Sequence, residues 1–221
     1  MTVRVGVVLS GCGFLDGAEI HEAVLSLYFL EKAGAEVHCF APNKDQMHVV
    51  NHLTGKPTNE KRNVLVESAR IARGKIRDLK DASMNGLEAL VLPGGYGAAK
   101  NLSDFATKGA DATVDRDLVR LVGEAVKARK PIVAICISPA VLAAALKQVG
   151  ASGKVTIGND AETAAAIKAL GSAHENCAVA EMVADEEHRL ISTPAYMLGP
   201  GPRDVGAGIE AAINQLMAWL R

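Results

Sequence analysis

The stretch PIVAICISP, residues 131–139, contains a continuous apolar run that ends abruptly. A run of this kind is typical of a strand that is buried on both faces of a parallel sheet. It ends at Cys136, and Pro139 then suits the first turn of a helix, where its missing N–H has no partner to lose. The stretch therefore predicts a strand that leads directly into a helix, as in α/β folds.

The same alternation extends in both directions along the chain. Residues 3–9 and 36–40 are strand-like, and residues 19–33 between them have helical spacing, with Gly34 placed to end the helix. This unit fits a right-handed crossover between parallel strands. Further strands are predicted at 87–92 and 155–157, a hairpin at 181–193, and helices around 98–105, 114–128, 139–149, 161–170 and 204–220. Apolar–polar alternation at 47–53 and 64–73 predicts a small sheet or hairpin insertion at an edge.

Composition places the chain among ordinary globular proteins. It has 221 residues, of which 49% are hydrophobic and 22% charged, and its formal net charge is -1. This balance argues against a disordered chain, a general nucleic-acid binder and a polybasic membrane-surface protein. With no internal repeat or linker, we expect one α/β domain over residues 1–221, doubly wound around a mostly parallel sheet.

Targeting and metal-binding signals are not evident in the sequence. No apolar run approaches the roughly 20 residues of a membrane-spanning helix, and the N-terminus leads directly into a strand-like run, so we expect a cytoplasmic protein. The four cysteines, at positions 12, 39, 136 and 177, are far apart and form no CxxC pair. Neither a zinc site nor a disulfide framework is indicated, and no cofactor is expected.

The residue types around Cys136 allow two interpretations of its role. At a sharp strand-to-helix turn a side chain projects beyond the sheet edge, and the helix N-terminus favours the reactive thiolate. The other interpretation is a buried thiol that packs as a small apolar group.

Two other segments would meet Cys136 at the same sheet edge. Glu22 lies on the predicted first helix, where it would be either a proton-shuttling partner of the sulfur or a solvated surface residue, and Glu19 competes for the same role. The glycines of PGGYG, residues 93–97, allow close backbone approach. The N–H groups of Gly94 or Gly95, with that of Ile137, are candidates for an oxyanion hole, and the alternative is a simple tight turn.

Several blocks of sequence resemble a known superfamily. LPGG (92–95) and AICISP (134–139) resemble the class I glutamine amidotransferase-like superfamily, in particular the branch of the parkinsonism-associated deglycase. The blocks SGCG (10–13), EIHEAV (19–24), NHLTG (51–55) and TPAYM (193–197) are similar to the enhancing lycopene biosynthesis protein family, whose name suggests a link to isoprenoid biosynthesis.

The resemblance implies a fold, a site and an activity. The fold would be flavodoxin-like, with Cys136 as nucleophile and Gly95 and Ile137 as oxyanion donors. Glu22 precedes Gly34 by twelve residues, as the paired carboxylate does in the deglycase branch. The associated activity is conversion of glyoxal to glycolate without glutathione or any cofactor. Because relatives self-associate, a homodimer is expected, with a small dicarbonyl as the other partner.

The sequence departs from the superfamily at the histidine that completes the constellation. Position 137 is Ile, and residues 157–160 contain no histidine, which argues against amide hydrolysis and a glutaminase-like subunit. His21 is a candidate substitute. Asn101 and Tyr196 are candidate pocket residues, with helix capping and packing as their alternative roles. The rival function is a cysteine-based redox sensor or small-molecule binding module with only incidental aldehyde turnover.

Overall fold

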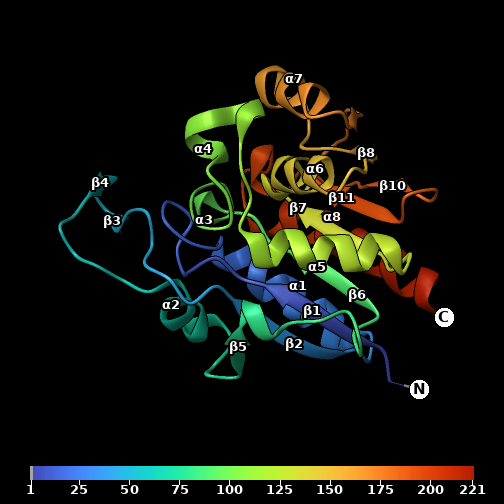
Figure 1. The fold of residues 1–221 in the computed structure, drawn as a ribbon, viewed down its shortest axis with the longest axis horizontal. Helices are drawn as coiled ribbons and strands as arrows, with labels where there is room; N and C mark the ends of the chain where they lie inside the picture. The colour runs from blue at the N-terminus through green and yellow to red at the C-terminus, as the bar shows by residue number, and fades with distance from the viewer. Residues whose placement is uncertain (1) are drawn as a thin grey trace.

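A seven-stranded sheet forms the centre of the computed structural model, which describes residues 2–221 (Figure 1). The strand order is β10-β11-β7-β6-β1-β2-β5, and every neighbouring pair is parallel except β10 with β11. The strands are β1 (Arg4–Val8), β2 (Glu36–Ala41), β5 (Ile76–Asp78), β6 (Ala89–Leu92), β7 (Ile132–Ile135), β10 (Val183–Asp185) and β11 (Leu190–Thr193). The predicted α/β class with a mostly parallel sheet is confirmed.

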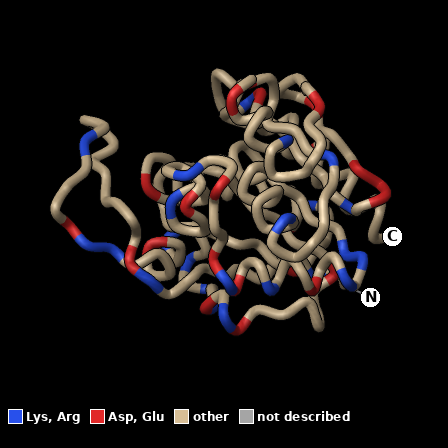
Figure 2. The backbone as a smooth tube through the Cα atoms, turned by 45° about the horizontal axis from the view of Figure 1, so that its top comes forward, with Lys and Arg blue, Asp and Glu red and all other residues tan. Residues whose placement is uncertain are grey.

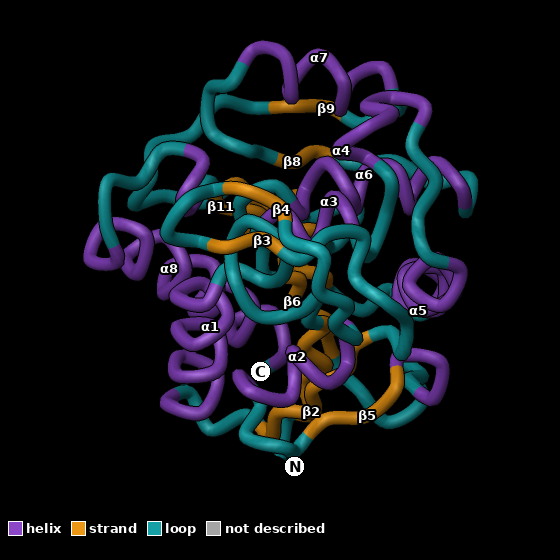
Figure 3. Tube along the Cα trace, turned by 90° about the vertical axis from the view of Figure 1, so that its left-hand side faces the viewer, coloured by secondary structure: helices purple, strands orange, loops and turns teal. Residues whose placement is uncertain are grey.

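Helices cover both faces of this sheet, as the edge view in Figure 3 shows. One apolar cluster packs α1, α2 and α8 on one face, and another packs α5, α6 and α7 on the other. The helices are α1 (Ile20–Lys32), α2 (Val64–Ile71), α3 (Tyr96–Lys100), α4 (Phe105–Lys108), α5 (Arg116–Lys127), α6 (Ser138–Gln148), α7 (Ala161–Ala169) and α8 (Pro202–Leu220), with 3-10 turns η1 (Leu79–Asp81), η2 (Gly109–Asp111) and η3 (Ala195–Met197).

The central elements form where the apolar periodicity predicts them. All residues of β6 and β7 are buried, which explains why these strands contain no polar positions. In α5 the buried residues Leu118, Leu121, Val122 and Ala125 follow the helical repeat, and the Asp115 side chain caps the first turn by accepting the Asp117 N–H.

The region between β2 and β6 differs from the prediction. Residues 64–73 do not join an edge sheet: Val64–Ile71 is α2, which begins where the Asn63 side chain accepts the Val66 N–H. The edge strand is β5, which the sequence analysis did not predict. The insertion is a short hairpin of β3 (Val50–Asn51) and β4 (Lys56–Pro57), which extends from the body in Figure 1.

Two other predicted elements are also shorter or differently paired. The helix expected around 98–105 divides into α3 and α4, with a loop between them. The strand expected at 155–157 is β8 (Lys154–Val155), and it pairs with β9 (Ala173–His174) outside the main sheet.

Charged residues of both signs are interspersed around the surface (Figure 2). Over residues 2–221, a search of the helices finds none with the length and apolar character needed to cross a membrane.

Candidate active site

Three loops meet where the adjacent strands β1, β6 and β7 end. They comprise residues 9–19, 93–97 and 136–138, and they lie beyond the carboxyl ends of parallel strands, where α/β sheets bind ligands. The Ser138 hydroxyl links two of the loops by donating a hydrogen bond to the Pro93 carbonyl at 2.8 Å.

Cys136 occupies the turn between β7 and α6. Its backbone has φ +63°, a left-handed conformation that is uncommon for a residue with a side chain. The Cys136 N–H donates to the Thr193 carbonyl at 3.0 Å, which ties the turn to the end of β11. Only 7% of the residue is exposed, so its side chain is almost completely enclosed by neighbouring residues. Strain of this kind, held by the surrounding structure, is common at functional sites.

Glu22 is the acidic partner of this sulfur. Its side chain is completely buried and lies beside Cys136, since a Cβ atom on Gly94 would contact both residues. One carboxyl oxygen accepts the Gly94 N–H at 2.9 Å, and the other accepts the Tyr196 N–H at 3.3 Å. Glu19 begins α1 and caps it, since its side chain accepts the Glu22 N–H at 2.7 Å. The helix start therefore fixes where the Glu22 side chain enters the site.

Burial dominates the protonation of the pair. It raises the pKa of Glu22 to about 8, and the negative charge of Glu19 adds to this effect. Burial also raises the pKa of the Cys136 thiol well above its usual range, helped by the Glu22 charge. The N–H groups of Gly95 and Ile137 oppose that rise in pKa, because they lie near the sulfur and favour its negative charge. At neutral pH the resting site therefore holds both a carboxylic acid and a thiol.

Gly94 leaves the space in which these two groups meet. A Cβ atom at this position would lie 2.5 Å from the Cys136 Cβ and 2.7 Å from a Glu22 carboxyl oxygen. Gly95 has φ +90°, and a Cβ there would lie 2.4 Å from the Glu19 backbone nitrogen. Glycine at both positions is thus required by close approach, which goes beyond the conformational freedom of an ordinary tight turn.

His21 and Tyr196 lie at the rim of the site. The His21 Nδ1 atom is 2.6 Å from the Tyr196 hydroxyl and 3.9 Å from a carboxyl oxygen of Glu19. His21 bonds to the Tyr196 hydroxyl and is not among the groups that shift the pKa of Cys136, so it does not take the place of the superfamily histidine. Tyr196 contacts Glu22 through its backbone N–H, and its ring packs at an angle beside His21.

Asn101 is a scaffold residue beneath the site. Only 2% of it is exposed, and its side-chain amide donates to the carbonyls of Ser10 and Asp16 at 2.9 and 2.8 Å. Its side-chain oxygen accepts the Met47 N–H at 3.0 Å. Asn101 also ends α3, but its side chain bonds the backbone of other segments and does not cap the helix.

Comparison with known proteins places the chain in a family. The family model described as the DJ-1/PfpI family matches residues 12–192. The chain belongs to the DJ-1/PfpI family. A crystal structure titled as an isoprenoid biosynthesis protein with amidotransferase-like domain, from Ehrlichia chaffeensis, is 40% identical, covers 100% of both chains and superposes with a TM-score of 0.93. The predicted resemblance and the flavodoxin-like fold are confirmed.

Curated relatives correct the expected compartment. The rat ES1 protein homolog, mitochondrial, is 44% identical over 97% of this chain and 83% of its own length. The human glutamine amidotransferase-like class 1 domain-containing protein 3, mitochondrial, is 45% identical over 97% and 82%. The expectation of a cytoplasmic protein is therefore wrong. The lack of a long apolar run and the first few residues, on which it was based, say little about the compartment in which a folded domain works.

Metal ligands do not gather at this site or elsewhere in the part of the chain that the structure describes. Over residues 2–221 there is no group of three or more His, Cys, Asp or Glu side chains arranged to hold an ion.

Proposed function

We propose that this protein is a glutathione-independent glyoxalase that converts glyoxal to glycolate. The observation that supports this most directly is the complete burial of the Glu22 carboxyl beside Cys136, with the N–H groups of Gly95 and Ile137 near the same sulfur. A nucleophile, a proton shuttle and two fixed donors are the groups that the reaction requires.

The reaction begins when the Cys136 sulfur bonds to one carbonyl carbon of glyoxal. Once Glu22 has released its own proton, the thiol proton passes to the Glu22 carboxylate. The former carbonyl oxygen is stabilised by the Gly95 and Ile137 N–H groups until it is protonated, giving a hemithioacetal. This step needs no leaving group, so it needs no histidine to protonate one.

Glu22 then moves a proton between the two carbons of the adduct. It removes the C–H proton of the carbon bonded to sulfur, which gives an enediol, and returns a proton to the neighbouring carbon. The product is a thioester of glycolate. Water cleaves the C–S bond, releasing glycolate and restoring the thiol, so glyoxal and one water are consumed with no net oxidation. A carboxyl whose pKa is about 8 exchanges protons readily near neutral pH, as this cycle requires.

The experiment that tests the proposal measures glyoxal loss and glycolate formation by the purified chain. We expect Cys136→Ala and Glu22→Gln each to lower kcat/KM by at least about 100-fold, the usual contribution of a positioned proton-transfer group. Cys177→Ser is the matched control, because Cys177 is partly exposed and lies outside the three loops. Wild-type turnover in either site variant would refute the assignment.

The rival function as a redox sensor is supported less well by the geometry. Peroxide-sensing cysteines are exposed and have a lowered pKa, because the thiolate is the form that is oxidised. Cys136 is only 7% exposed, and burial raises its pKa. Any role in isoprenoid biosynthesis would follow the name of the Ehrlichia protein and is part of this proposal only as a pathway association.

A further inference from the structure

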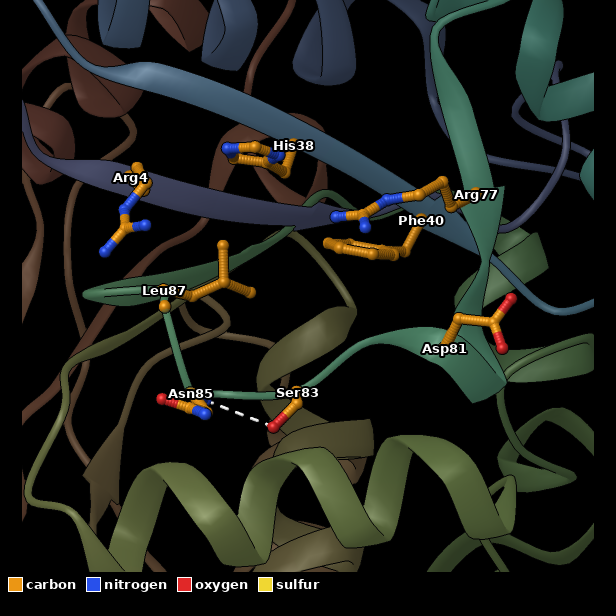
Figure 4. A pocket seen from close by; sticks show the side chains of 9 residues that line it. Arg4, His38, Phe40, Arg77, Asp81, Ser83, Asn85 and Leu87 are labelled. Atoms are coloured by element: carbon orange, nitrogen blue, oxygen red, sulfur yellow. Dashed lines mark hydrogen bonds between the residues drawn. The ribbon is translucent and has the colours of Figure 1, made fainter.

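A cavity of about 220 Å³ lies on the opposite face of the sheet from α1 and Glu22 (Figure 4). It is lined by none of the residues that contact Cys136. Its floor is formed by side chains of β1, β2 and β5, and its other wall is the segment 81–87, which crosses in front of α5.

Strand register explains why these floor residues share a face. Gly6 pairs with His38, Val8 with Phe40 and Phe40 with Arg77, and Arg4 lies two residues before Gly6 on the same face. Gly6 has no side chain to occupy the floor. A Cβ at that position would lie 2.9 Å from a methyl carbon of Leu87, which forms part of the cavity wall.

The opposite wall is held in place by charged side chains of α5 and the segment that follows it. Arg120 donates to the Ala82 carbonyl at 2.8 Å, and Glu124 accepts the Met84 N–H at 2.8 Å. Lys130 donates to the Leu87 carbonyl at 2.6 Å. Because these bonds fix the backbone of the segment, the cavity is preformed and a ligand would lose little free energy in ordering it.

The polar groups that remain free in the cavity are mainly donors. The Arg77 guanidinium lies over the Phe40 ring, with its carbon 4.9 Å from the ring centroid. Within residues 2–221 it has no hydrogen bond or ion pair to an acceptor, so its N–H edge is available. Arg4 uses Nη2 for Glu88 at 3.3 Å, and its Nη1 is 3.6 Å from where a Gly86 Cβ would be.

The remaining polar side chains agree with a site for an anion. Asn85 donates its backbone N–H to the Ser83 hydroxyl, which leaves its side-chain amide free to contact a ligand. The one carboxylate that lines the cavity, Asp81, turns away from the Phe40 ring in Figure 4, whereas the Arg77 guanidinium lies along that ring.

We propose that this cavity binds a small anion through a carboxylate or phosphate group held by Arg77. A guanidinium fixed against an aromatic ring presents two parallel N–H donors, the arrangement that best fits the paired oxygens of these groups. Arg4 and Asn85 would contact the rest of the ligand. The cavity is smaller than a typical drug-sized pocket, so the ligand class is a small organic acid or a small phosphate ester.

Calorimetric titration of the full chain with malonate and with inorganic phosphate, at constant ionic strength, tests the proposal. We expect saturable 1:1 binding of at least one probe, and which one binds more tightly identifies the headgroup. Arg77→Gln should weaken it about tenfold or more, as expected for loss of a bidentate charged contact. Arg77→Lys should restore only part of the affinity, and Asp81→Asn should strengthen binding by removing a nearby negative charge.

Two controls separate this site from general charge and from the cysteine site. Arg203→Gln removes one positive charge at an exposed position on α8, and Cys136→Ser alters the candidate active site, so both should bind as wild type. The proposal is overturned if neither probe binds saturably, or if Arg77→Gln binds as tightly as Arg203→Gln. Circular dichroism of each variant confirms that a loss of binding is not a loss of fold.

Discussion

Replacing Glu22 with glutamine should reverse the order of stability between variant and wild type as the pH rises. Burial raises the pKa of this carboxyl from an ordinary 4.5 to about 8. Between these values the folded state retains a proton that the unfolded state has released, so wild-type stability falls as pH rises through this range and then levels off. The pKa difference corresponds to about 5 kcal/mol, an upper value because the site can relax around the charge.

Glutamine is uncharged at every pH, so the variant lacks this loss. Its amide nitrogen cannot accept the Tyr196 N–H, which the wild-type carboxyl accepts at 3.3 Å, and this costs about 1 kcal/mol. We therefore expect Glu22→Gln to be slightly less stable than wild type at pH 5 and about 4 kcal/mol more stable at pH 9. For a chain of this size that gain corresponds to a rise in Tm of about 10 °C.

Urea unfolding of both proteins at intervals from pH 5 to pH 9 measures the effect directly. Cys136→Ala provides the control, because desolvation is the largest cause of the raised pKa and remains when the sulfur is removed. The pH-dependent loss of stability should therefore persist in Cys136→Ala. Parallel stability curves for wild type and Glu22→Gln would show that the carboxyl ionises normally, which would contradict the electrostatic account of the site.

The remaining predictions concern catalysis, packing and association. The kcat/KM for glyoxal should rise from pH 6 to pH 9 with an apparent pKa near 8, because only deprotonated Glu22 accepts the thiol proton, and steady-state rates should show no such rise in Glu22→Gln. Gly94→Ala should abolish turnover and lower the unfolding free energy by about 1–3 kcal/mol, since its Cβ would overlap the catalytic pair. Asn101→Ala should lower the urea midpoint, at a cost of about 2–4 kcal/mol, because three backbone groups lose their partner. The homodimer remains a prediction. We expect exposed residues of α1, Val24 among them, to form its interface, so Val24→Glu should give a monomer by light scattering, whereas Val66→Glu on α2 should not.

Much of the fold could be predicted because its central strands are buried on both faces. The segments that form β6 and β7 contain no polar residue, so their strand conformation can be predicted from composition alone. The segment that became α2 could not be assigned this way. Its apolar residues fit either period, and the Asn63 cap that decides the matter is a single local hydrogen bond.

Part of the candidate site could also be predicted from the sequence, and part could not. Cys136 and the two glycines could be predicted from their positions at strand ends. The pairing of Cys136 with Glu22 was expected from the resemblance. The work of Asn101 could not be foreseen, since its partners Ser10, Asp16 and Met47 are far from it in sequence. The cavity beside Arg77 could not be predicted from the sequence either, because it depends on strand order and on the position of the segment 81–87.

The raised pKa values of both reacting groups argue for aldehyde chemistry over hydrolysis of an amide. With a carboxylic acid and a thiol at rest, the site holds no charge that must be solvated, which allows its nearly complete burial. A reactive dicarbonyl can draw the sulfur into a bond once Glu22 has lost its proton, because the negative charge moves to an oxygen that the backbone donors stabilise. An amide is far less electrophilic and also needs an acid for its leaving nitrogen. Glu22 therefore serves better to move a proton between two adjacent carbons, a step that is open to a dicarbonyl and not to an amide.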